Sequence, residues 1–263
     1  MNQKDTPITA LRPRVVATFK RAWREGVLVL AGLGMLVGFM ALEPVAQDPA
    51  YHDFADQRVL FGVPNLLDVA SGVPFLFIGI GGILLCAGRH RPPLVASWSA
   101  LFVAATLVCL GSGYYHWRPD DGTLFWDRLP MALAFMALFV ALVCEHLGEG
   151  LERFLLVPAL AVGLAGTLWW HYTDDLRLYG WVQFTPLVCI PLVLALFPGR
   201  YTHRAYVTYG LGLYAVAKLA ELYDREVFAL TAHAVSGHTL KHVLAAGALL
   251  TILLMLALRR DRP

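Results

Sequence analysis

Hydrophobic residues in this chain form long runs that are separated by short polar segments. A helix rises about 1.5 Å per residue, so about 20 mostly apolar residues cross a hydrocarbon layer about 30 Å thick. Each run of roughly this length predicts a membrane-spanning helix. Eight such runs cover residues 26–43, 65–87, 94–116, 124–147, 153–171, 180–198, 205–223 and 238–258.

The runs predict an all-α fold, a polytopic transmembrane helical bundle. Lipid cannot hydrogen-bond an open backbone, so only helices and closed barrels span a membrane, and continuous apolar runs differ from the alternating pattern of barrel strands. The composition agrees, because 58% of the residues are hydrophobic and 15% are charged. Only the run at 205–223 is interrupted near its end, by Lys218 and Glu221, which are spaced to pair on one helix face.

Most connections between the runs are too short to form another domain. A basic segment before an apolar run also fits a signal peptide, with small residues nearby at Ala46 and Ala50. The long basic lead favours a retained helix, and in either case the chain lies outside before residue 65. We expect a basic tail at 1–25, an extra N-terminal helix at 26–43, a loop at 44–64, a seven-helix core at 65–258 and a short tail at 259–263.

The placement of Lys and Arg predicts the orientation, because these residues are enriched in cytoplasmic segments. Fourteen of them fall on the side of the two termini, whereas four, Arg58, Arg118, Arg177 and Arg225, fall in the opposite loops. Both termini are therefore expected in the cytoplasm, and the loop at 44–64 outside it. The formal net charge is only +2, and the basic tail follows this membrane rule rather than indicating nucleic-acid binding.

Polar residues within the apolar runs are costly in lipid and are therefore the first candidates for function. Three groups of them fall at the extracytoplasmic ends of their predicted helices. The first joins the end of the third run to the start of the fourth, the second lies at the start of the last run, and the third opens the second run. In this order they contain Ser112, His116 and Asp127, then His238 and His242, then Asn65, Asp68 and Ser71.

Three of these residues, His116, His238 and His242, have the pattern of a metal site. His238 and His242 are four residues apart, so both imidazoles point from one helix face, as in helical metal-ligand pairs. Three imidazoles with one open position are typical of catalytic Zn²⁺, whereas structural zinc has four protein ligands. The sequence therefore predicts a zinc site at the outer edge of the membrane.

Asp127 and Ser112 are the predicted catalytic partners of this site. Asp127 can take a proton from the attacking water and pass it to a leaving amine. Ser112 can donate a hydrogen bond to the developing oxyanion. Each residue also has a structural interpretation, Asp127 as an acid in the first turn of a helix and Ser112 as a small residue for close helix packing. Ser71 either supports a histidine ligand or packs beside Gly72.

The combined motifs resemble those of the alkaline ceramidase family, which belongs to a superfamily of seven-helix membrane hydrolases that includes adiponectin-receptor-like proteins. The motifs are GSxxxH ending at His116, D-x-L-P-M from Asp127, N-x-x-x-V-x-S from Asn65 and the HxxxH of the last run. The resemblance covers residues 53–258. It implies zinc on the three histidines, catalytic roles for Ser112 and Asp127, and cleavage of ceramide to a sphingoid base and a fatty acid.

Two features depart from the family pattern. The helix at 26–43 is an addition to the seven-helix core. The resemblance also implies an acidic Ca²⁺ site, for which this chain offers only a partial set, since Asn65 stands where an acid is expected and Gly72 where an asparagine is expected. Oxygen ligands suit calcium, but the same residue types also serve as helix caps. The partial calcium set consists of Asp53, Asp56, Asn65 and Asp68.

Three functions follow as hypotheses from different classes. The first is a zinc-dependent membrane amidase that hydrolyses ceramide, phytoceramide, an N-acyl amino lipid or another lipid amide entering from the outer leaflet. The second is a lipid receptor or sensor that keeps a structural zinc site. The third is a haem- or metal-handling membrane protein, because paired intramembrane histidines also ligate haem. The sequence leaves the exact lipid and the oligomeric state open.

Overall fold

The computed structural model describes the backbone of residues 7–262 and the side chains of residues 22–262. It confirms the all-α bundle, and 78% of the chain is helical. The predicted basic tail at 1–25 lies mostly outside the described side chains. The helices are α1 Pro7–Ala41, α2 Leu66–Ser71, α3 Val73–Ala87, α4 Val95–Trp117, α5 Asp121–Leu147, α6 Glu152–Thr173, α7 Arg177–Leu196, α8 Ala205–Leu222, α9 Asp224–Leu230 and α10 Gly237–Leu258.

Each predicted run after the first forms a helix within a few residues of its expected ends, whereas α1 begins at Pro7, inside the segment predicted as a tail. The run at 65–87 is divided at Gly72 into α2 and α3, which together still make one span. The short helix α9 was not predicted. In the described part of the chain, seven helices are long and apolar enough to cross a membrane, and α8 is not among them. Lys218, Glu221 and several tyrosines make α8 more polar, yet it packs along α10.

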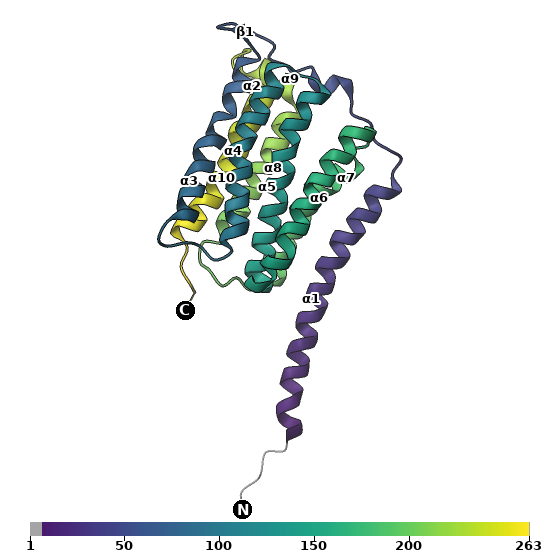
Figure 1. Cartoon of the computed structure of the whole chain (residues 1–263), viewed down its shortest axis with the longest axis vertical. Helices are drawn as coiled ribbons and strands as arrows, with labels where there is room; N and C mark the ends of the chain where they lie inside the picture. The colour runs from purple at the N-terminus through teal and green to yellow at the C-terminus, as the bar shows by residue number, and fades with distance from the viewer. Residues whose placement is uncertain (1–6, 263) are drawn as a thin grey trace, which may run out of the picture.

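The long helices lie side by side, and α1 stands at the edge of the bundle beside α7 (Figure 1). Three hydrogen bonds hold α1 there: Trp181 Nε1 donates to the Gly32 carbonyl at 3.0 Å, and Arg177 Nη1 donates to the Met40 and Leu42 carbonyls at 3.2 and 2.8 Å. The additional helix is therefore docked on the core.

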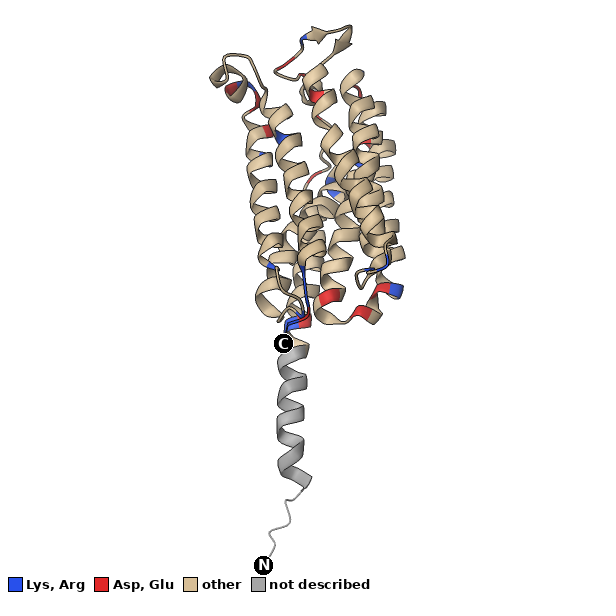
Figure 2. Ribbon diagram, turned by 90° about the vertical axis from the view of Figure 1, so that its left-hand side faces the viewer, with Lys and Arg blue, Asp and Glu red and all other residues tan. Residues whose placement is uncertain are grey.

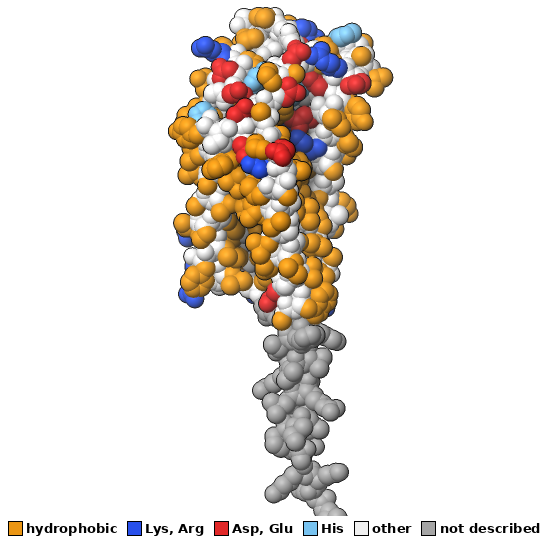
Figure 3. All heavy atoms as spheres, turned by 90° about the vertical axis from the view of Figure 1, so that its right-hand side faces the viewer, with side chains coloured by type: hydrophobic (Ala, Val, Ile, Leu, Met, Phe, Trp, Pro, Cys, Tyr) orange, Lys and Arg blue, Asp and Glu red, His pale blue; other side chains and the backbone are white. Residues whose placement is uncertain are grey.

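Most charged residues lie near the two ends of the bundle (Figure 2), and hydrophobic side chains cover much of the face shown in Figure 3 between them. This apolar belt is the surface that a multi-pass membrane protein presents to lipid. One end carries the last residues of the chain (Figure 1). At the other end α4 finishes and α2, α5 and α10 begin, as the apolar runs predicted; we call it the upper end.

The segment between α1 and α2 lies across the upper end. It contains a short 3-10 helix, Pro49–His52, and a two-stranded hairpin of β1 Val59–Leu60 and β2 Val63–Pro64. Its backbone is tied to other connections: Leu176 N donates to the Val45 carbonyl at 2.8 Å, and Gln47 N to Asp174 Oδ1 at 2.9 Å. The predicted loop at 44–64 is thus a packed cover over the helix ends.

Candidate metal centre

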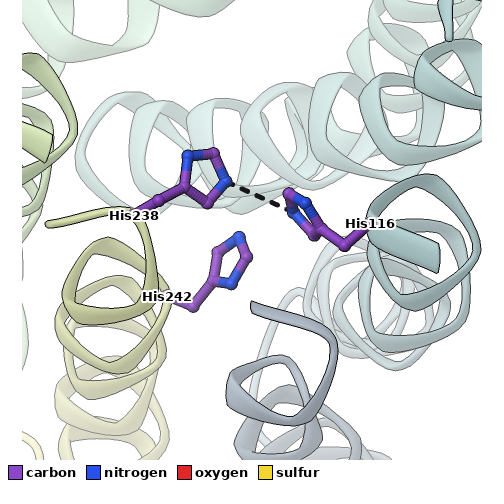
Figure 4. A group of neighbouring side chains, drawn as sticks. All are labelled: His116, His238 and His242. Carbon is purple, nitrogen blue, oxygen red and sulfur yellow. Dashed lines mark hydrogen bonds between the residues drawn. The ribbon is translucent and has the colours of Figure 1, made fainter. Parts of the chain in front are cut away.

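The side chains of His116, His238 and His242 converge at the upper end, between α4 and α10 (Figure 4). All three are buried, and one nitrogen atom of each lies within 4.8 Å of the corresponding atoms of the other two. Nε2 of His116 and Nε2 of His238 are 3.3 Å apart. The three-histidine cluster predicted from the sequence is confirmed as a group that could hold a metal ion.

Local structure at the start of α10 explains how two of the histidines are placed. Ser236 caps the helix, since its Oγ accepts from Thr239 N at 2.9 Å. His238 therefore lies in the first turn and His242 one turn later on the same face. The His238 backbone N–H donates to Asp224 Oδ1 at 2.7 Å, which ties this turn to α9.

Glycine allows this turn to approach its neighbours closely. A Cβ atom on Gly237 would lie 2.1 Å from the Ala220 carbonyl oxygen and 2.6 Å from Asp224 Cα. Any larger residue would push α10 away from α8 and α9. Gly237 thus sets the distance between α10 and its neighbours beside the histidine cluster.

One pair of donor atoms in the cluster has the spacing of ligands on a tetrahedral metal ion. Two nitrogens bound to zinc at about 2.0–2.1 Å with tetrahedral angles are about 3.3 Å apart, which matches the separation of the His116 and His238 Nε2 atoms. His116 Nδ1 is buried and has no hydrogen-bond partner among the described residues. The imidazoles are therefore not satisfied by protein groups alone.

Ser71 holds the ring of His242. Ser71 Oγ donates to the Asp68 carbonyl at 2.9 Å and lies 2.7 Å from His242 Nδ1. Because the hydroxyl hydrogen is directed at the carbonyl, Nδ1–H of His242 is the donor to Ser71, which leaves Nε2 with a free lone pair. This is the support that metal-binding histidines commonly have. Of the two interpretations of Ser71, the contact with a histidine is the one observed.

Lys241 is a component that the sequence reasoning missed. Its Nζ lies 2.8 Å from His238 Nε2 and 3.1 Å from Glu221 Oε1, and Glu221 also pairs with Lys218. The ammonium donates to the lone pair that a metal ion would use on His238, so Lys241 and a cation compete for this nitrogen. The sequence feature that could have identified Lys241 is its place between two candidate ligands within an apolar run.

Phe54 is a second missed component. Its side chain is 3% exposed, and its ring centroid lies 4.8 Å from that of His116 and 4.7 Å from that of His238. Phe54 therefore covers the cluster from the side of the 44–64 loop and separates it from solvent. No pattern in the sequence distinguishes this loop residue from other loop aromatics.

Ser112 and Asp127 are brought together by direct contact between α4 and α5. A Cβ atom on Gly111 would lie 2.0 Å from the Trp126 carbonyl oxygen and 3.3 Å from Asp127 Cα. Both side chains are buried, and both line the same cavity as His242. Ser112 Oγ lies beside the Asp127 carboxyl but makes no hydrogen bond of ordinary length to a described residue. A buried hydroxyl without a partner is free to bond to a ligand in that cavity.

The cavity has a volume of about 410 Å³ and extends from the cluster into the bundle. Its upper part is polar, and its lower part is lined by aliphatic residues such as Leu138, Ile190 and Ile252. His242 and Ile252 are ten residues apart on α10, which corresponds to about 15 Å along the helix. A polar end and a long apolar end match the shape and chemistry of an acyl lipid.

The four residues of the predicted calcium set do not come together. Asp53 pairs with Arg225 and accepts from Gln57, and Asn65 Nδ2 donates to the His116 carbonyl at 2.9 Å. Asp68 accepts from the hydroxyls of Ser236 and Thr239, at 3.2 and 2.5 Å. Within the described residues the histidine cluster is the one group of three or more His, Cys, Asp or Glu able to hold a metal ion.

Asp56 shows how the residues of the predicted calcium set are engaged in the structure. Both of its carboxylate oxygens accept from Arg58, at 2.7 and 2.6 Å, and these hydrogen bonds hold the pKa of Asp56 below its usual value. An arginine two residues away occupies the oxygens that a calcium ion would need. The loop acids therefore stabilise the cover, and Asn65 and Asp68 support α4 and α10.

Comparison with models of known protein families finds no match, and no curated protein sequence matches the chain.

Proposed function

We propose that this protein is a zinc-dependent membrane amidase that hydrolyses the amide bond of a ceramide-like N-acyl lipid. The observation that carries the proposal is the buried three-histidine cluster, of which His242 lines the polar part of a largely apolar cavity. The motif resemblance to alkaline ceramidases supports the same reaction. The distribution of Lys and Arg supports an active site on the extracytoplasmic side and termini in the cytoplasm.

His116, His238 and His242 would hold the zinc ion and leave one position for water. When bound by three imidazoles, zinc lowers the pKa of a water molecule toward about 7 and polarises the scissile carbonyl. Ser71 keeps the Nδ1 proton of His242 on the far side of the ring, so that Nε2 remains the ligand.

The residues on α4 and α5 supply the proton transfers and the oxyanion contact. The Asp127 carboxylate accepts a proton from the attacking water and returns it to the nitrogen of the leaving amine. The Ser112 hydroxyl, which is buried without a partner, donates to the carbonyl oxygen as negative charge develops there. The lower cavity binds the acyl chain, and Phe54 limits access of bulk water.

The test is hydrolysis of N-acyl lipids by the purified protein, combined with metal analysis. Fatty acid release should stop with a chelator and return with zinc, and His238→Ala should be inactive. His171→Ala is the matched control, because His171 lies at the same end of the bundle but outside the cluster. Active, folded protein without stoichiometric metal would contradict the zinc mechanism.

A lipid receptor with a structural metal is the second candidate. The same cavity and histidine cluster would serve to bind lipid and metal without turnover. This candidate predicts bound metal and bound lipid without product after long incubation. No specific contact among the described residues favours the haem alternative.

A further inference from the structure

Arg128 occupies a buried aromatic pocket beside the candidate site. Its side chain is 6% exposed, although it begins only two turns into α5. The guanidinium carbon lies 4.2 Å from the ring centroid of Trp170, 5.0 Å from that of Tyr179 and 5.4 Å from that of Tyr51. Nη2 donates to Gln47 Oε1 at 2.6 Å. Three rings and one amide therefore hold the guanidinium in a fixed position.

The charge of Arg128 has no carboxylate partner. Among the described residues no salt bridge reaches it, and its Nη1 atom is buried without a hydrogen-bond partner. The other cations that line the cavity are paired: Lys218 and Lys241 with Glu221, and Arg177 with Asp175. The Asp127 carboxylate acts on Arg128 through space but forms no salt bridge with it, and a buried charge without a salt bridge is costly.

The position of Arg128 relates it directly to the reacting group of a bound lipid. Arg128 follows Asp127 on α5 and lines the same cavity as Asp127, Ser112 and His242. Adjacent helical residues diverge by about 100°, so Asp127 faces α4 while Arg128 faces α6 and α7. Arg128 therefore borders the cavity beside Asp127, where the amine portion of a lipid amide would lie if its acyl chain filled the aliphatic lower part.

We propose that Arg128 is an anion-binding residue and that the substrate is an N-acyl lipid with an anionic oxygen group on its amine portion. This inference rests on the proposed amidase function. A guanidinium presents planar N–H donors that suit a carboxylate or a phosphate, and it stays charged inside a protein. N-acyl amino acids and phosphorylated sphingoid amides both carry such a group, whereas neutral ceramide does not.

The reaction requires only water in addition to the substrate. The water oxygen bonds to the acyl carbon, the carbon–nitrogen bond breaks, and the leaving nitrogen takes up the proton. The products are a fatty acid and an amine that retains the anionic group. Arg128 is unchanged at the end of the cycle.

The experiment uses two pairs of substrates that differ by the anionic group. N-oleoylglycine is compared with N-oleoylethanolamine, and ceramide 1-phosphate with ceramide, for the full-length protein in lipid nanodiscs. The anionic member of at least one pair should have a kcat/KM about tenfold higher or more, as expected for a charge-assisted hydrogen bond. The carboxylate and phosphate pairs distinguish the two sources of the anion.

Arg128→Gln should reduce this ratio to about one tenth of the wild-type ratio or less. Arg225→Gln is the matched control, because Arg225 pairs with Asp53 at the same end and does not line the main cavity, and it should keep the wild-type ratio. Arg128→Lys keeps the charge without the planar donors and should give an intermediate ratio. Thermal melting of each variant separates a loss of binding from a loss of folding.

Binding to the inactive His242→Ala variant separates this inference from the proposed function. If this variant binds N-oleoylglycine or ceramide 1-phosphate in preference to its neutral counterpart, and the wild type hydrolyses none of the four, the anion site stands and the amidase proposal fails. If the wild type hydrolyses both members of each pair equally, the amidase proposal stands. In that case Arg128 only holds the 44–64 loop through Gln47, and the anion inference is overturned.

Discussion

Replacing Ser71 with alanine tests whether the histidine cluster is a metal site in which Ser71 orients the ring of His242. In the structure Ser71 Oγ, at 2.7 Å, is the side-chain acceptor of His242 Nδ1–H, and both residues are buried. Ser71→Ala removes that acceptor from a buried N–H group and leaves only the Asp68 backbone near it. The imidazole is then free to rotate or to change its tautomer, and either change withdraws Nε2 from the cluster.

The expected change in zinc affinity follows from the free-energy cost of the lost hydrogen bond. A buried donor left without an acceptor costs about 1–3 kcal/mol, and about 1.4 kcal/mol corresponds to a tenfold change in affinity. The hydrogen bond from Ser71 to the Asp68 carbonyl is present with or without metal, so its loss largely cancels in the affinity. We therefore expect zinc to bind about 10- to 100-fold more weakly, as for other partners of metal ligands.

The assay is titration of metal-free protein with zinc in competition with a chelating indicator. Ser97→Ala is the control, because Ser97 is also fully buried and its Oγ has no hydrogen-bond partner. It should leave zinc affinity unchanged. Equal zinc affinities for Ser71→Ala and wild type would refute the inference that Ser71 orients a ligand.

Three further predictions concern the framework of the site. Gly111→Ala should lower the free energy of unfolding by about 1–3 kcal/mol, because its Cβ would lie 2.0 Å from the Trp126 carbonyl oxygen. Gly113→Ala is the control, since the space around Gly113 is open, and melting curves of the two variants should differ. Hydrogen bonds from Arg177 lower the pKa of Asp175, and burial raises it. The hydrogen bonds have the larger effect, so the pKa of Asp175 lies below its usual value. The stabilisation is therefore present above about pH 4 and is lost as pH falls through the lowered pKa, and Asp175→Asn should flatten this acid limb of the melting temperature. Trp181→Phe removes the hydrogen bond to the Gly32 carbonyl and should loosen α1 by about 0.5–1.5 kcal/mol, measured by hydrogen exchange of the α1 amides against wild type.

Features that depend on local pattern could be predicted from the sequence. Continuous apolar runs specify helices because lipid accepts few other structures, and the four-residue spacing of His238 and His242 fixes a common face. The alternating direction of successive spans places His116 at the same end. Together these rules locate the cluster before any tertiary contact is known.

Features that depend on partners distant in sequence could not be predicted. Asp56 and Asn65 have the residue types of a calcium site, yet one pairs with Arg58 and the other binds the His116 carbonyl. Phe54 and Arg128 acquire their roles from rings and carbonyl groups on other segments. A sequence states which donors and acceptors exist, whereas the packed loops decide which of them meet.

Lys241 changes the interpretation of the Lys218–Glu221 pair, because it joins the pair from a distant part of the sequence. Lys218 and Glu221 alone read as a structural pair on one helix. Lys241 joins them from α10, so that one carboxylate serves two ammonium groups while one of these groups also contacts His238. A divalent cation on the histidines would repel Lys241, and Glu221, already 3.1 Å from its Nζ, provides the place to which the ammonium can turn. With a metal ion on the histidines, Glu221 would hold the displaced ammonium of Lys241.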